Sequence, residues 1–342
     1  MINLTTGPIS LDKPVYQALI SEPISHRSVE FQTMHQEVVN KLCEQLQAKQ
    51  TFILQGSGTL ANEAMLWQIK MLKSKGIILS NGEFGNRLIK QSKKIGLNYL
   101  KHKTSWGNEF CLGTIETLIQ THNLKWILFC HCETSTGVVN NIKAIASISQ
   151  KYNCKVFVDC MSTIGTIQID LSNISMATGS SGKGLCSLSG IALVFSNINI
   201  AKSSKIPRYL DLFYYKSKKG IPFTLSSNQL KALSISIQQT MNTDYWNQKD
   251  AYARKVHDAL YSLGVIPFAT KSSRVFTIIQ KKINSQDLSS HLNKIGLSLS
   301  YQSKYLLKRN WLQLTLFGNH NYDQIDFAVS SLKKEISQAI SS

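Results

Sequence analysis

The sequence lacks long apolar runs, and no stretch approaches the roughly 18 residues that a membrane-spanning helix requires. It also lacks a basic N-terminal region followed by an apolar segment, so we expect neither a signal peptide nor a membrane partner. The seven cysteines include no Cys-x-x-Cys pair. An odd, scattered set of this kind predicts reduced thiols in a cytoplasmic protein.

Acidic residues are scarce: 20 Asp and Glu oppose 38 Lys and Arg, which gives a net charge of +18. A basic surface favours nucleic acid, anionic membranes or anionic ligands. Here the lysines are dispersed, with short clusters such as the one in residues 216–219, and Lys, Asn, Ile and Ser are all abundant. This pattern favours compositional bias as the origin of the basic charge. The alternative is that the charge serves to bind an anionic cofactor and substrate. A nucleic-acid partner is not expected, because no recognition motif accompanies the charge.

The length of 342 residues predicts two domains. Between residues 50 and 195, short apolar runs alternate with helical patterns, and polar or glycine-rich turns follow the runs. The apolar runs are residues 51–54, 76–80, 126–130, 156–158 and 191–195. This alternation predicts an α/β fold with a mostly parallel sheet and helices on both faces. We expect an N-terminal segment (1–28), a large domain (29–244) and a small α+β domain (245–342).

One lysine stands among small residues in the stretch ATGSSGKGL, residues 177–185. About twenty residues earlier, the apolar strand pattern 156–158 ends in Asp159. Pyridoxal phosphate chemistry needs such a pair: Lys183 forms a Schiff base, and Asp159 keeps the pyridine nitrogen protonated. Taken alone, a lysine beside glycines is more often an ordinary loop residue, and an aspartate after a strand is often a turn residue. The pair gains weight from the other motifs.

Three further motifs follow predicted strands. GSGT (56–59) leads from a strand into a helix, where free N–H groups can bind phosphate, although many helices begin with Gly and Ser. Phe84 lies between glycines after the strand 76–80, where an aromatic ring could stack on a flat ligand or fold into the core. The sequence His-Cys-Glu (131–133) could suggest a metal, but three adjacent residues do not readily converge on one ion, so we expect none.

Together these pieces resemble the class V aminotransferases of fold-type I, the group that includes alanine–glyoxylate, serine–pyruvate and 2-aminoethylphosphonate–pyruvate aminotransferases. The resembling motifs span residues 4–240 in the family's order: TGP (6–8), SHRS (25–28), GSGT (56–59), NGEFG (81–85), HCETSTGV (131–138), VD (158–159) and SGKGL (181–185). The resemblance implies a large three-layer domain and a small α+β domain. It also implies a PLP-dependent aminotransferase that moves an amino group between a small amine or amino acid and a keto acid or aldehyde. A homodimer with active sites at the subunit interface is expected.

The resemblance also implies residue roles. Lys183 corresponds to the Schiff-base lysine, which also carries the proton between substrate and cofactor, and Asp159 to the pyridinium partner. Phe84 takes the place of the aromatic that stacks on the cofactor ring, and Thr134 matches the position beside the phenolic oxygen. Gly7 matches the N-terminal segment that borders the substrate. Phosphate binding is expected of Ser57, Gly58 and Thr59.

The sequence departs from the family at several positions. Gly182 stands where the family often has a glutamine that contributes to phosphate binding. The loop 215–222, which in dimeric relatives reaches the neighbouring phosphate, has Gly220 at the usual threonine position and several basic residues nearby. Gln313 replaces the arginine that grips the substrate carboxylate, and a neutral amide cannot make that two-pronged ionic contact. Arg27 is a candidate substitute. The loss motivates an alternative function, a PLP-dependent lyase or other non-transaminating enzyme.

Overall fold

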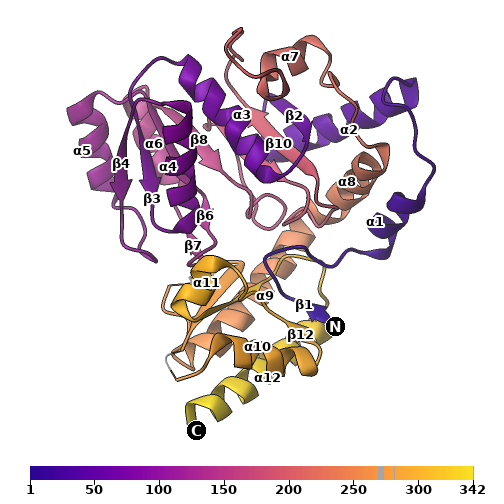
Figure 1. Cartoon of the computed structure of the whole chain (residues 1–342), viewed down its shortest axis with the longest axis vertical. Coiled ribbons are helices and arrows are strands. Elements are labelled where there is room, and N and C mark those ends of the chain that lie inside the picture. The colour runs from indigo at the N-terminus through magenta and orange to yellow at the C-terminus, as the bar shows by residue number, and fades with distance from the viewer. Residues whose placement is uncertain (269–272, 281, 342) are drawn as a thin grey trace.

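The computed structural model describes residues 1–268, 273–280 and 282–341 (Figure 1). The first third comprises β1 (Ile2–Asn3), α1 (Lys13–Gln17), η1 (Ala18–Ile20), α2 (Val29–Leu46), β2 (Gln50–Gln55), α3 (Gly58–Met71), β3 (Gly76–Ser80), α4 (Glu83–Ile95), β4 (Tyr99–Lys103) and α5 (Leu112–His122). Then follow β5 (Trp126–Cys130), β6 (Cys132–Glu133), β7 (Val138–Val139), α6 (Ile142–Lys151), β8 (Lys155–Asp159), β9 (Met176–Ser180), β10 (Ile191–Ser196), η2 (Arg208–Leu210), α7 (Leu212–Ser217) and α8 (Ser227–Thr240). The last part holds α9 (Thr243–Tyr261), β11 (Val275–Ile279), α10 (Ser285–Lys294), β12 (Leu297–Ser298), α11 (Lys304–Arg309), β13 (Trp311–Thr315) and α12 (Tyr322–Ser341).

A seven-stranded sheet with the order β2-β10-β9-β8-β5-β3-β4 forms the centre of the larger part of the molecule. The neighbours from β9 to β4 run parallel, whereas β10 runs antiparallel to both β9 and β2. The predicted α/β class with a mostly parallel sheet is therefore confirmed. Parallel neighbours present their carboxyl ends at one edge, which is where ligands bind in open α/β sheets.

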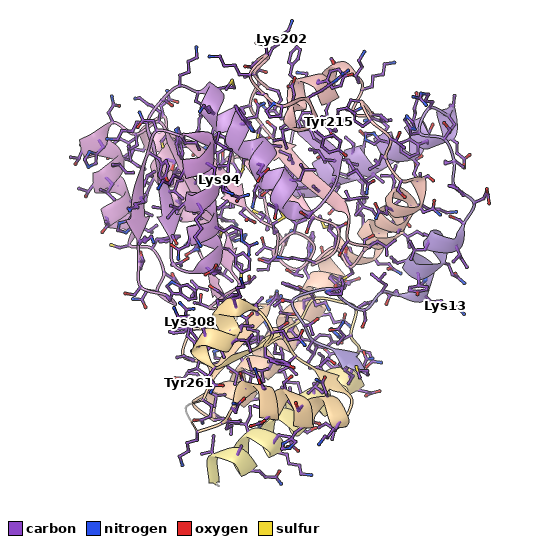
Figure 2. All side chains as sticks on the ribbon, viewed as in Figure 1. Lys13, Lys94, Lys202, Tyr215, Tyr261 and Lys308 are labelled. Atoms are coloured by element: carbon purple, nitrogen blue, oxygen red, sulfur yellow. The ribbon has the colours of Figure 1, made fainter. Side chains whose placement is uncertain are left out.

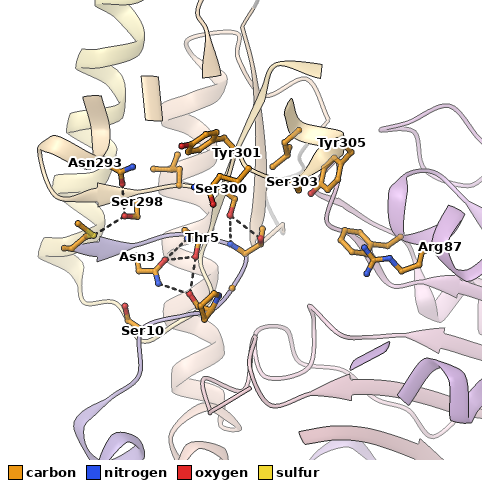
Figure 3. A pocket seen from close by; sticks show the side chains of 18 residues that line it. Asn3, Thr5, Ser10, Arg87, Asn293, Ser298, Ser300, Tyr301, Ser303 and Tyr305 are labelled. Atoms are coloured by element: carbon orange, nitrogen blue, oxygen red, sulfur yellow. Dashed lines mark hydrogen bonds between the residues drawn. The ribbon is translucent and has the colours of Figure 1, made fainter. Parts of the chain in front are cut away.

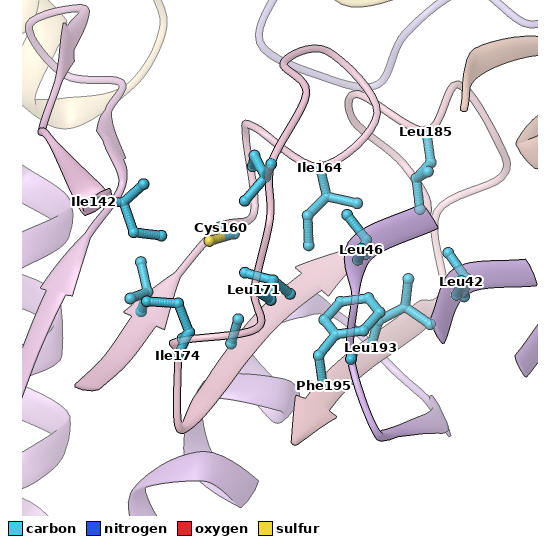
Figure 4. Packing of buried hydrophobic residues seen from close by; sticks show 14 of the residues in the cluster. Leu42, Leu46, Ile142, Cys160, Ile164, Leu171, Ile174, Leu185, Leu193 and Phe195 are labelled. Carbon is cyan, nitrogen blue, oxygen red and sulfur yellow. The ribbon is translucent and has the colours of Figure 1, made fainter. Parts of the chain in front are cut away.

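Helices cover both faces of this sheet and bury its alternating side chains. On β5, Ile127 and Phe129 join a core with α2, α5, α6 and α8, while Trp126 and Leu128 join a second core with α3 and α4. Figure 4 shows part of the first core, where side chains of α2 meet those of β10. Two cores separated by one sheet make the three layers that the resemblance implied.

The stretch that contains Lys183 differs from the expected loop in one respect. Residues Met176–Ser180 form β9, a strand between β8 and β10, and the turn begins at residue 181. Alanine, glycine and serine carry a weak strand signal because they bury little apolar surface, and a single threonine does not reveal the strand. Small residues are nevertheless required here, since a Cβ on Gly179 would lie 2.9 Å from the Ile164 side chain.

The C-terminal residues form a smaller unit, drawn in orange and yellow below the large sheet in Figure 1. In this unit β11 pairs antiparallel with β13, and α9, α10 and α12 contribute to its separate apolar core. The first residues of the chain, which the sequence analysis assigns to a separate N-terminal segment, join this unit: β1 pairs with β12, and Leu4 lies in its core.

No helix within the described ranges combines the length and apolarity needed to cross a membrane. The proposed boundaries at residues 28 and 244 stay predictions.

Candidate active site

Asp159 ends β8 at the carboxyl edge of the sheet, and its carboxylate is held on both oxygens. Asn62 Nδ2 donates to Oδ2 at 2.8 Å, and the Met161 N–H donates to Oδ1 at 3.0 Å. Asn62 is itself oriented, because the Thr178 hydroxyl donates to its Oδ1 at 2.6 Å. The side chain of Asp159 is only 9% exposed. Its orientation is therefore fixed by residues from α3, β9 and the turn after β8.

Lys183 lies in the tight turn that follows β9. The turn is closed by the Ser187 N–H, which donates to the Ser181 carbonyl at 3.0 Å, and by the Cys186 N–H, which donates to the Lys183 carbonyl at 2.9 Å. Lys183 Nζ lies 5.6 Å from the centroid of the Phe84 ring. Burial lowers the pKa of the Lys183 amine from its ordinary value, and the nearby Asp159 opposes this shift. Burial thus raises the neutral, nucleophilic fraction of the amine.

The neighbourhood of Lys183 also explains the glycine before it. A Cβ on Gly182 would lie 2.2 Å from Ser189 Oγ and 2.9 Å from Ser189 Cα, so the glutamine common in relatives would not fit here without moving the backbone. On its other side the Gly182 carbonyl faces Gly7, and a Cβ on Gly7 would lie 3.8 Å from the carbonyl oxygen. The N-terminal segment therefore borders the lysine turn.

Phe84 is held over the site by the first turn of α4 and by a buried carboxylate. Glu133 accepts hydrogen bonds from the Phe84 N–H (3.1 Å), the Gly85 N–H (2.9 Å) and the Ser135 hydroxyl (2.6 Å). Glu133 is fully buried, and burial raises the pKa of its carboxyl while these donors lower it. The Phe84 ring meets Tyr305 edge-on at 6.4 Å.

These side chains enclose a cavity of about 170 Å³, here called the inner cavity. Its lining residues are Gly58, Thr59, Asn62, Phe84, Arg87, Cys130, Cys132, Thr134, Asp159, Met161, Ser162, Ser180 and Lys183. Gly58 begins α3 beside the cavity, and a Cβ there would lie 2.4 Å from Met161 Sδ. Ser57 precedes it as an exposed N-cap whose side chain makes no capping bond. Six of the eight predicted cofactor residues thus line one space, and Ser57 and Gly182 are chain neighbours of lining residues.

A larger space opens next to the inner cavity and is here called the outer cavity. Its volume is about 690 Å³, and it lies between the N-terminal segment, Phe84, Arg87 and residues 293–306 (Figure 3). Phe84 and Arg87 line both cavities, and Gly7 lines the outer one. The two spaces therefore meet at the side chains of one helical turn of α4.

The other predicted substrate residues lie elsewhere. Gln313 is completely buried on β13, where its Nε2 donates to the Thr134 carbonyl and to Thr277 Oγ1, and its Oε1 accepts from Tyr305. It lines neither cavity. Arg27 lines a third space of about 440 Å³ with basic residues of the loop before Pro222. The structure does not bring Arg27 to the inner cavity, and substrate binding by either residue stays a prediction.

Three residues of the site have no role in the sequence-based prediction. Asn62 and Arg87 lie one turn into α3 and α4, behind the motifs GSGT and NGEFG, and a polar residue at that helical spacing is the one signal that could have found them. Glu133 lies in the cluster that suggested a metal. Its carboxylate binds backbone N–H groups instead, and His131 pairs with Thr163 Oγ1 at 3.0 Å. The contacts of Glu133 with Phe84 and Gly85 join distant segments and leave no local signal.

Comparison with known proteins assigns the chain to a family. The family model described as Aminotransferase class-V matches residues 14–207, more than half of the chain. The chain belongs to the class-V aminotransferase family. The matching segment ends before the smaller unit, as do the resembling motifs.

Two curated relatives are similar to parts of this chain. A 2-aminoethylphosphonate–pyruvate transaminase of Bacillus mycoides is 28% identical over 201 residues, which cover 57% of this chain and 55% of that protein. An uncharacterized aminotransferase of Methanocaldococcus jannaschii is 25% identical over 292 residues, which cover 81% and 76%. The chain thus matches little more than half the length of the Bacillus relative.

Solved structures match nearly the whole fold. Ureidoglycine–glyoxylate aminotransferase from Bacillus subtilis has a TM-score of 0.87 at 20% identity and covers 98% of this chain and 93% of its own. Alanine–glyoxylate aminotransferase from Nostoc sp. has a TM-score of 0.85 at 20% identity, with 99% and 95% covered. These likenesses show the fold, which is fold-type I.

The class-V aminotransferase family implies pyridoxal 5′-phosphate, and the residues present fit this cofactor. A fixed carboxylate (Asp159), an amine (Lys183) and an aromatic face (Phe84) line one cavity, and a helix begins at its wall. Cys132 also lines the cavity, but burial raises the pKa of its thiol to about 12, so it stays protonated near neutral pH.

Proposed function

We propose that this protein is a PLP-dependent aminotransferase that moves an amino group between a small amine or amino acid and a keto acid or aldehyde. The observation that carries the proposal is the placement of Lys183, Asp159 and Phe84 around one cavity at the carboxyl edge of the sheet. Bound there, the cofactor supplies an electron sink that stabilises the negative charge left when the substrate loses a proton.

Each of these residues has a proposed task. Asp159 binds the pyridine nitrogen and keeps it protonated, and the hydrogen bonds from Asn62 and Met161 fix the carboxylate for this contact. Phe84 stacks on one face of the ring. Lys183 attaches the cofactor and then removes and returns the substrate proton, which its lowered pKa favours.

The phosphate group has a proposed seat at the start of α3. Ser57, Gly58 and Thr59 present N–H groups at the positive end of the helix dipole, and the free Ser57 hydroxyl adds a donor. Gly182 offers the phosphate no side chain, so any contact from this position is made by its backbone. Thr134, which is buried and lines the inner cavity, is the proposed partner of the phenolic oxygen.

We also propose a homodimer with active sites at the interface and a cytoplasmic location. The basic loop with Lys218 and Lys219 supports the dimer, because it lines the third space with residues of α2 and has no anionic partner among the described residues. Light scattering should give twice the chain mass, and a monomer with full activity would contradict the proposal. The free state of all seven cysteines supports a reducing compartment.

A lyase or other non-transaminating enzyme on the same fold is the second candidate, and the family does not favour it. The buried Gln313 motivates it, since no arginine stands at that place. One experiment separates the two candidate functions. PLP-loaded protein is mixed with one amine, and the carbonyl product and the state of the cofactor are both followed. A transaminase yields pyridoxamine phosphate in amounts equal to the carbonyl product, whereas a lyase releases ammonia and keeps its cofactor unchanged.

A further inference from the structure

Most amino donors carry an anionic group, and β13 offers no cationic side chain that could bind it. Gln313 occupies the relevant strand position, and all three hydrogen bonds of its amide go to protein atoms. Its side chain has no exposed surface. An incoming carboxylate would have to break these bonds and would gain a neutral donor in return, which is unfavourable. The donor's anionic group must therefore be bound elsewhere.

Arg87 offers a cation at the boundary between the two cavities. Its guanidinium carbon lies 4.8 Å from the centroid of the Phe84 ring, so the charge lies beside the aromatic side chain that is proposed to hold the cofactor. The side chain is exposed, and no carboxylate in the described ranges forms an ion pair with it. Its charge is available to a ligand.

The other arginines near the site are engaged. Arg309 stacks on Trp106 at 3.9 Å and lies 5.4 Å from the centroid of the Trp311 ring. Arg274 is buried and donates to Asp250 and to the Thr166 carbonyl. Neither lines the inner or the outer cavity. Of the described arginines around the site, Arg87 is the one that faces both.

The outer cavity has the lining that a polar substrate needs. Its walls carry hydroxyl and amide side chains, among them Thr6, Ser300, Tyr301 and Gln302, and Arg87 is the single charged side chain among its described lining residues. Figure 3 shows Arg87 across the cavity from Ser300 and Tyr301. A wall of neutral hydrogen-bonding groups with one cation at its inner end is suited to a ligand with one anionic end.

We propose that Arg87 binds the anionic group of the amino donor at the junction of the two cavities and thereby sets specificity for amines that carry one oxyanion. This inference rests on the proposed aminotransferase function. The oxyanion is a carboxylate or a phosphonate, since a guanidinium binds both through two parallel hydrogen bonds. Arg87 thus takes over the task that relatives give to an arginine on the strand.

The test compares Arg87→Gln and Arg87→Lys with a matched control on the same helix. Lys90→Gln removes a cation one turn further along α4, at an exposed position that lines neither cavity. Calorimetry with PLP-loaded protein measures binding of two unreactive probes, propionate and ethylphosphonate. This readout does not depend on turnover. The visible spectrum and the thermal midpoint report whether each variant is folded and loaded.

We expect Arg87→Gln to weaken binding of at least one probe about 10- to 100-fold, and Arg87→Lys to weaken it less. Lys90→Gln should bind like wild type. The tighter probe identifies the oxyanion as carboxylate or phosphonate. Equal binding by wild type and Arg87→Gln, or binding of neither probe by wild type, overturns the proposal.

Reaction rates separate this inference from the proposed function. With alanine and 2-aminoethylphosphonate as donors, Arg87→Gln should raise KM about 10-fold or more, while its rate with ethylamine changes less than about 3-fold. Equal losses with charged and uncharged amines contradict the role of Arg87. Wild-type protein that binds the probes but converts no amine contradicts the aminotransferase function and leaves the anion site standing.

Discussion

Asp159 carries the charge on which the chemistry of the inner cavity depends. Its two oxygens already accept bonds from Asn62 and Met161, so the carboxylate cannot turn away from the cavity without losing them. Asp159→Asn keeps the shape of the side chain and removes the charge. We expect the affinity for PLP to fall about 10- to 100-fold, the usual effect of losing a charge-assisted bond.

Cofactor titration followed by tryptophan fluorescence measures this affinity. Asp170→Asn is the control, because Asp170 is exposed and lies outside the cavity. If Asp159→Asn bound PLP as tightly as wild type, the assignment of Asp159 to the pyridine nitrogen would be wrong.

At the scale of single elements, α4 depends on a carboxylate from another segment. Glu133 accepts the N–H groups of Phe84 and Gly85 at the start of the helix, and a Cβ on Gly82 would lie 2.4 Å from its carboxyl carbon. Close approach of backbone and carboxylate fixes the Phe84 ring over Lys183. Glu133 is thus a positioning residue whose effect reaches the cofactor through Phe84.

We expect Glu133→Gln to lower the free energy of unfolding by about 1–3 kcal/mol, because a buried amide accepts less strongly and brings donors that lack partners. It should also reduce the circular dichroism of the bound cofactor, since the stacked ring loses its fixed orientation. Urea unfolding and visible dichroism measure the two effects. Glu83→Gln, on the first turn of the same helix, is the control. Unchanged dichroism in Glu133→Gln would show that Phe84 is positioned without it.

The elements show where prediction from sequence succeeds. The runs that form β5 and β8 are apolar on both faces, so burial determines their structure and their ends point to the site. The sequence predicts a loop in place of β9 because its small residues carry no such pattern. It does not predict β4, because the half-exposed residues YLKHK carry three basic side chains.

The residues of the site also divide into those that the sequence predicts and those that it does not. Lys183, Asp159 and Phe84 can be found because each ends or follows a strand, and the carboxyl ends of parallel strands meet at one edge. Asn62, Arg87 and the bonds of Glu133 depend on which helix faces which strand, and this is decided by tertiary packing. The buried amide of Gln313 cannot be foreseen, because its partners lie 8, 36 and 179 residues away.

For the whole molecule, three buried histidines link stability to pH. Burial lowers the pKa of His35, His131 and His320 to about 4 from 6.5. The unfolded chain therefore binds more protons than the folded chain between about pH 6.5 and pH 4, and stability falls as the pH falls through this range. For each histidine, this shift lowers the free energy of unfolding by at most about 3 kcal/mol as the pH falls through this range.

His35 gives the clearest test, since its Nε2 has no hydrogen-bond partner among the described residues and its ring packs against Gly220. We expect the urea midpoint of His35→Gln to fall less steeply between about pH 6.5 and 4 than that of wild type. His122→Gln, at an exposed position on α5, should follow wild type. Parallel curves for His35→Gln and wild type would contradict the shifted pKa.

The basic charge is a property of the whole surface. Figure 2 shows Lys13, Lys94, Lys202 and Lys308 at distant points of both parts of the molecule, so these lysines do not form one patch. Dispersed charge of this kind attracts small anions to the whole surface. The contact proposed for Arg87 differs, because it depends on one side chain at the two cavities.

The most direct measurement is the visible spectrum of the purified protein with PLP, recorded before and after one amine is added. We predict an absorbance band that requires Lys183, that disappears with 2-aminoethylphosphonate or alanine as pyridoxamine phosphate forms, and that returns with pyruvate. A band that survives Lys183→Ala would contradict the assignment of the lysine. A band that responds to amines but never yields pyridoxamine phosphate would contradict amino transfer and favour the lyase.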